Sequence, residues 1–118
     1  MSVSLLNNSS VYPQVTINTQ TGAYTFVAAD GTNALVQMNT TSNVALTIPP
    51  NSSVAYPVGT VLNFATINTG TITITQGSGV TIVSTGATAS APTLRARYSA
   101  GTAIQTSANN WLVIGDLA

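Results

Sequence analysis

Residues 43–83 limit the possible folds of this chain more than any other stretch, because strand and turn patterns alternate along its length. Segments 43–48 and 60–67 are rich in β-branched residues and alternate apolar with polar positions, which predicts two strands. Between them lie residues that break regular structure: Pro49, Pro50, Pro57 and Gly59. We therefore expect a long loop at 49–59 that crosses the end of a β-structure.

The same pattern continues on both sides of this stretch. We expect further strands at 14–18, 23–28, 34–39, 71–75, 80–83, 93–98, 102–106 and 111–114. Gln76-Gly77-Ser78-Gly79 has the length and glycine content of a hairpin turn. Short strands with turns about every eight to twelve residues predict an all-β fold, an antiparallel β-sandwich, jelly roll or small barrel. We expect residues 1–20 to form an N-terminal arm or edge segment and 21–118 a single β domain.

The chain has only four charged side chains, which are Arg95, Arg97, Asp30 and Asp116. Charged residues make up 3% of the sequence, against about 25% in an ordinary soluble domain. A surface with so little charge has little electrostatic protection against association. We expect much of the surface to be covered in a larger assembly, and the alternative is a monomer with a hydroxyl- and amide-rich surface.

The composition argues against an enzyme. The chain has no histidine and no cysteine, so a Ser–His catalytic pair cannot form and a zinc site is not expected. Nothing in the sequence indicates that Asp30 and Asp116 converge into a paired-carboxylate site. We expect no catalytic residues, no metal and no cofactor.

Nucleic acid and membranes are not expected partners either. Two arginines are too few for the basic surface that nucleic-acid binding needs. No apolar run approaches the roughly 18 residues that span a bilayer, and the first residues lack the basic start of a signal peptide.

Several residues are candidate contacts in an oligomer. Arg95 and Arg97 are two apart and share one face of the strand expected at 93–98. They form either a solvated, locally paired face or a docking point for Asp30 or Asp116 of a neighbouring subunit. Further candidates are Leu5 and Leu6 in the N-terminal segment, and Tyr56 and Pro57 in the loop at 49–59, which we expect to be rigid.

Trp111 and the tyrosines allow two interpretations. Together with Tyr12, Tyr24, Tyr56 and Tyr98, Trp111 could form a platform on which a sugar stacks. Packing in the core or at an interface is the alternative that we favour, because large aromatic side chains are mostly buried.

The segments AYTFVAADG, LVQMN, VALTIPPNSSVAYPVGT, GVTI and LRARYSAGTAIQTSANNWLVIGDL resemble a β-rich module that recurs in virion proteins of tailed bacteriophages. The resemblance covers residues 23–117, and TIPPNSSVAYPVGT and the final WLVIGDL are its most distinctive parts. Such modules form trimers and occur as capsid decoration (cement) proteins and as terminal domains of tail fibres.

The resemblance implies a homotrimer that binds the major capsid protein on the outer surface of the virion and stabilises the head, after synthesis in the host cytoplasm. The alternative that it implies is a tail-fibre module that recognises a glycan or receptor on the host surface. It implies no catalytic residues.

Overall fold

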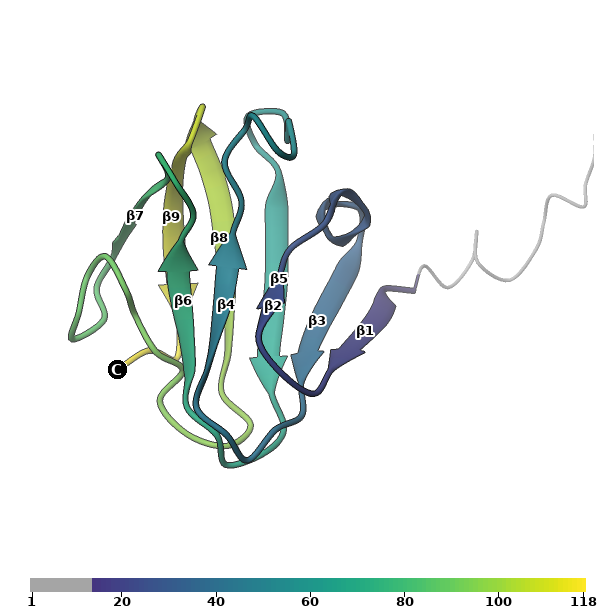
Figure 1. Cartoon of the computed structure of the whole chain (residues 1–118), viewed down its shortest axis with the longest axis vertical. Helices are drawn as coiled ribbons and strands as arrows, with labels where there is room; N and C mark the ends of the chain where they lie inside the picture. The colour runs from purple at the N-terminus through teal and green to yellow at the C-terminus, as the bar shows by residue number, and fades with distance from the viewer. Residues whose placement is uncertain (1–13) are drawn as a thin grey trace, which may run out of the picture.

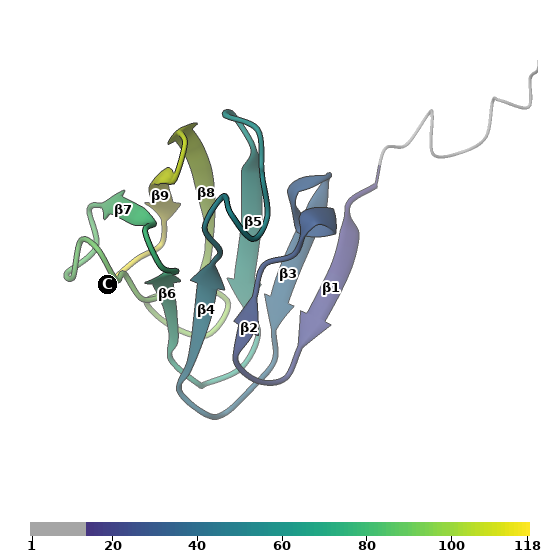
Figure 2. The ribbon, with the colours of Figure 1, turned by 45° about the horizontal axis from the view of Figure 1, so that its top comes forward.

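The protein is built from strands that form two facing sheets (Figures 1 and 2), seen in a computed structural model that describes residues 14–118. The larger, six-stranded sheet has the order β1-β3-β5-β8-β9-β7, with the bounds β1 Thr16–Gln20, β3 Ala34–Met38, β5 Val61–Thr66, β7 Thr81–Ser84, β8 Ala100–Ser107 and β9 Asn110–Gly115. The smaller, three-stranded sheet has the order β2-β4-β6, with the bounds β2 Tyr24–Thr25, β4 Val44–Ile48 and β6 Ile72–Gln76. A short 3₁₀ helix, η2 (Ala28–Gly31), precedes β3. The predicted all-β character is confirmed.

The chain winds as a coil that passes alternately through the two sheets. It runs from β1 to β2, from β3 to β4 and from β5 to β6, then returns to the larger sheet as β7 (Figure 1). Successive strands of one sheet therefore run in the same direction, and five of the seven strand pairings within residues 14–118 are parallel. The hairpin β8–β9 is inserted between β5 and β7 and provides the two antiparallel pairings.

The predicted antiparallel pairing is therefore wrong for most of the fold, and the strand directions are not those of a jelly roll. Two separate sheets also replace the single closed sheet of a barrel. The physical reason is that alternation of apolar and polar residues records which face of a strand is buried. It carries no information on the direction of the neighbouring strand.

Two local predictions are corrected as well. Gln76-Gly77-Ser78-Gly79 does not close a hairpin, because β6 and β7 belong to different sheets. The strand expected at 93–98 is reduced to isolated bridges at Thr93 and Leu94, followed by a turn. Thr93 and Leu94 lie against β6, so this segment covers the edge of the smaller sheet.

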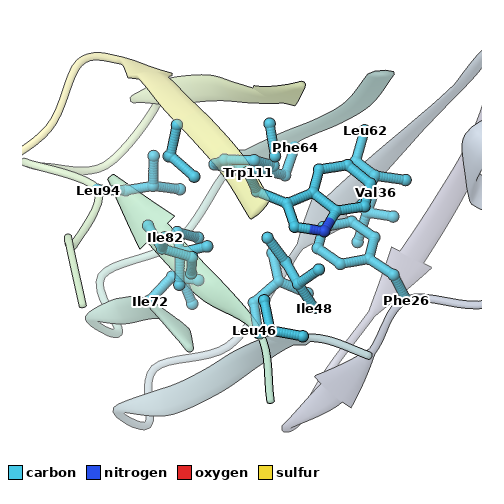
Figure 3. Close-up of a cluster of buried hydrophobic side chains, with 14 of the residues drawn as sticks. Phe26, Val36, Leu46, Ile48, Leu62, Phe64, Ile72, Ile82, Leu94 and Trp111 are labelled. Atoms are coloured by element: carbon cyan, nitrogen blue, oxygen red, sulfur yellow. The ribbon is translucent and has the colours of Figure 1, made fainter. Parts of the chain in front are cut away.

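The core fills the space between the two sheets (Figure 3). The alternating residues of each strand that point inward are the buried ones, such as Leu62 and Phe64 in β5 and Ile72 and Ile74 in β6. Strands β3, β4, β5 and β6 each contribute an inward row to this core, whereas no residue of β1 belongs to it. No helix in residues 14–118 is both long enough and apolar enough to span a bilayer.

Candidate functional site

The solvent-facing side of the six-stranded sheet, here called the outer face, carries rows of aliphatic side chains and no charged side chain from its strands. Strand register places Val61, Ile104, Leu112 and Val83 in one continuous row across β5, β8, β9 and β7. A second row of the outer face contains Ile17, Leu35, Asn63, Thr102 and Ile114. Val61, Leu112 and Val83 are exposed, as are Ile17 and Ile114 at the ends of the second row. Contiguous exposed aliphatic surface of this kind marks an interaction site on a soluble protein.

A groove of about 530 Å³ lies across the second row. Its floor includes Asn63 and Thr102, whose side chains are joined by a hydrogen bond of 2.9 Å from Thr102 Oγ1 to Asn63 Oδ1. Gly101 and Gly115, which face each other in β8 and β9, line the groove with backbone. The outer face is therefore a hollowed surface of aliphatic rows, with one polar pair at its centre and a second, Gln37 and Thr19, on β3 and β1.

A tight turn, Ala96–Ser99, presents Arg97 and Tyr98 to solvent. The Ser99 N–H donates to the Ala96 carbonyl at 3.0 Å and closes the turn. Tyr98 has a φ of 73°, a left-handed conformation usual for glycine at the third position of a type II turn. Such a conformation costs a bulky residue about 1–3 kcal/mol. The Tyr98 side chain is 71% exposed, and the Arg97 guanidinium lies 5.0 Å from the centre of its ring.

The Ala96–Ser99 turn is fastened to the body on two sides. Its backbone exchanges hydrogen bonds with Thr66, from Tyr98 N–H at 2.8 Å and to the Ser99 carbonyl at 3.0 Å. Ser99 Oγ donates to Asp116 Oδ2 at 2.7 Å. Arg95 binds both oxygens of the same carboxylate, at 2.7 and 2.8 Å.

Arg95 and Asp116 thus pair with each other within the chain. The hydrogen bond from Arg95, followed by that from Ser99, lowers the pKa of Asp116. The structure supports the local-pairing alternative for Arg95 and separates it from Arg97, which is not on a shared strand face but in the turn. Arg97 Nε instead donates to the Ile67 carbonyl at 3.1 Å.

Asp30 is an internal structural residue and has no surface to offer a neighbour. It is 3% exposed and lies in η2. Its carboxylate accepts hydrogen bonds from Asn18 Nδ2 at 2.9 Å, the Tyr24 hydroxyl at 2.8 Å and the Val27 N–H at 2.8 Å. The expected contact between Asp30 and an arginine of another subunit is corrected accordingly. Burial, then the hydrogen bond to Asp30, raises the pKa of Tyr24.

Tyr56 and Trp111 belong to the core. Both are buried, and their rings meet edge to face with centres 5.7 Å apart. The Tyr56 hydroxyl donates to the Val27 carbonyl, and burial, with the nearby charge of Asp30, raises the pKa of Tyr56 above its ordinary value. Core packing is therefore the role of Trp111, whose buried ring offers no platform to a sugar, and Tyr12 lies outside the described residues.

Pro57 is exposed in the loop between β4 and β5. Its carbonyl accepts from Thr60 N–H at 3.1 Å and from Gln105 Nε2 at 3.1 Å. Gln105 is buried and also donates to the Tyr56 carbonyl at 2.8 Å. These bonds attach the loop to β8, and its rigidity stays a prediction.

Leu5 and Leu6 lie outside the described residues. Neither the outer face nor the conformation of Tyr98 follows from the sequence pattern alone. Apolar residues on both faces of segment 60–67 indicate that its outward side is apolar as well. Which residues of other strands join them in a row depends on strand register. No metal-binding group of acidic residues is present within residues 14–118.

The structural class of this protein is a two-sheet β-coil with mostly parallel strands, an inserted hairpin and an uncharged outer face. No protein-family model matches the chain, and comparisons with curated proteins and with solved structures returned no significant match.

Proposed function

We propose that this protein is a structural protein of a tailed-bacteriophage virion, a capsid decoration protein that associates with itself through the outer face. The observation that carries self-association is the aliphatic row Val61, Ile104, Leu112 and Val83. The outer face has no charge, so two copies meet there without like-charge repulsion. The resemblance of residues 23–117 to phage virion modules supports the virion setting and the homotrimer.

The driving force is burial of aliphatic surface that the single chain leaves in water. Complete burial of a valine, leucine or isoleucine side chain contributes about 1.5–3 kcal/mol. Leu112 is 36% and Ile114 47% exposed, so each retains roughly a third to a half of that contribution for an interface. Several such residues together offset the cost of association, which is about 4–15 kcal/mol.

The mass of the protein in solution, measured by light scattering during size-exclusion chromatography, tests the self-association. We expect a trimer for the natural sequence and a monomer for Leu112→Glu combined with Ile114→Glu, because an interface would bury the new charges without partners. Two controls keep the trimer: Val58→Glu, which places a charge on the exposed loop between β4 and β5, and Arg95→Gln, which removes the intrachain ion pair. A folded monomer at all concentrations for the natural sequence would contradict the proposal.

Binding to capsids tests the virion role separately. We expect the trimer to co-sediment with empty capsids of the phage that encodes it and to raise their melting temperature. A trimer that neither binds nor stabilises those capsids would leave self-association standing and contradict the decoration role.

A further inference from the structure

Arg97 is the one charged side chain in residues 14–118 that is exposed and has no charged partner. Arg95 and Asp116 engage each other, and the carboxylate of Asp30 is buried and hydrogen-bonded inside the fold. The sequence contains no other aspartate or glutamate. A second copy of the chain therefore has no free side-chain carboxylate to place against Arg97. An anionic side-chain partner for Arg97 therefore has to come from a different molecule.

Tyr98 gives that partner an apolar surface. The chain keeps a tyrosine at a backbone position where glycine is favoured, and it holds the ring out in water. Strain of this kind concentrates at functional sites. Hydrogen bonds to Thr66 and Asp116 hold the turn in place, so the ring is presented from a turn that is fastened to the body.

Amide and hydroxyl groups are present in the turn that Arg97 contacts and in the turn next to it. Arg97 Nε binds the carbonyl of Ile67 in the turn between β5 and β6. In the same turn, Asn68 Nδ2 donates to Asn39 Oδ1 at 3.0 Å and links it to the turn between β3 and β4. Thr69 and Asn39 are exposed. These groups exchange hydrogen bonds readily with the hydroxyls of a sugar.

We propose that the Arg97–Tyr98 turn is a binding site for a carboxylate-bearing saccharide. Arg97 pairs with the carboxylate through guanidinium nitrogens other than Nε, and Tyr98 stacks against the apolar face of the sugar ring. The neighbouring turns bind the ring hydroxyls. A saccharide fits this site better than a protein does, because a stable protein interface needs about 800 Å² on each side, and the large apolar surface of this molecule lies on the outer face of the six-stranded sheet.

Biolayer interferometry with the full chain and four immobilised polymers tests the site. Alginate and colominic acid carry carboxylates on sugars, dextran is a neutral saccharide, and poly-L-glutamate carries carboxylates without sugars. We expect binding to alginate or colominic acid only. Arg97→Gln and Tyr98→Gly each weaken it at least about tenfold, as loss of a central contact does, while Tyr98→Phe retains most of it.

Two readouts separate binding from structure and from general charge. Tyr98→Gly relieves the left-handed strain, so its melting temperature stays equal to or rises above that of the natural sequence while binding is lost. Ser78→Asp changes the net charge by the same amount as Arg97→Gln. Ser78 lies in the corner after β6, at the end of the strands opposite to the Arg97–Tyr98 turn (Figure 1). We expect Ser78→Asp to leave binding unchanged.

The proposal is overturned if neither acidic polysaccharide binds, or if poly-L-glutamate binds as well as they do, which would indicate an acidic protein partner. It is also overturned if Ser78→Asp weakens binding as much as Arg97→Gln, or if Tyr98→Gly lowers the melting temperature along with binding. Chromatographic mass is recorded for every variant, so loss of self-association is distinguished from loss of the saccharide site.

Discussion

Replacing Asp30 by asparagine tests whether this carboxylate is an internal anchor. The substitution keeps the size of the side chain and removes its charge. Oδ2 accepts from both the Tyr24 hydroxyl and the Val27 N–H, whereas Oδ1 accepts from Asn18 Nδ2. Asparagine has a single acceptor oxygen, so one of these positions then holds an NH₂ group that faces a donor.

The expected loss follows from these three bonds. Two of them survive as neutral bonds, each weaker by about 1 kcal/mol than a bond to a charged group, and the third, worth about 1.5–3 kcal/mol, is lost. Relief of the burial cost of the carboxylate offsets part of the sum. We expect the free energy of unfolding to fall by about 2–4 kcal/mol, which lowers the melting temperature by roughly 10 °C in a domain of this size.

Urea unfolding followed by the fluorescence of Trp111 measures this change, since Trp111 is the single tryptophan and is buried. Asp116→Asn is the matched control, because it neutralises the exposed carboxylate, and we expect a much smaller effect. A loss below about 1 kcal/mol for Asp30→Asn would refute the anchoring role. If Asp30→Asn left the stability of the monomer unchanged and abolished self-association, the result would support a contact between Asp30 and another subunit.

Two further predictions concern backbone space and high pH. Gly115→Ala should destabilise the protein by more than about 2 kcal/mol in the same urea assay, because its Cβ would lie 2.5 Å from the Ala100 carbonyl oxygen and φ is 141°. The control Gly22→Ala, whose Cβ meets no atom within 4 Å, should change the stability by no more than about 0.5 kcal/mol. Equal effects of the two substitutions would contradict this account. Because the pKa of Tyr56 is raised in the folded state, its contribution to stability is complete below the unfolded value of about 10 and is lost as pH rises through the folded pKa. Tyr56→Phe should flatten the fall in stability between pH 9 and 11, and an unchanged slope would refute the assignment.

The sequence by itself was sufficient to place most of the strands. Alternation in segments such as 60–67 and 102–106 corresponds to β5 and β8, because a half-buried strand must present apolar residues at every second position. It failed at 93–98, where Leu94, Ala96 and Tyr98 alternate like a strand. There the chain instead bridges the edge of β6 through Thr93 and Leu94 and then forms the turn that exposes Tyr98.

Only the tertiary structure decided which strands are neighbours, and that determined the candidate surfaces. Val61 and Val83 are far apart in the sequence, but the insertion of β8 and β9 between β5 and β7 joins them in one row. Likewise, the charge census limited the possible ion pairs, but folding paired Arg95 with Asp116, buried Asp30 and left Arg97 exposed. Composition and periodicity are local properties of the chain, whereas register and pairing depend on how the coil closes around its core.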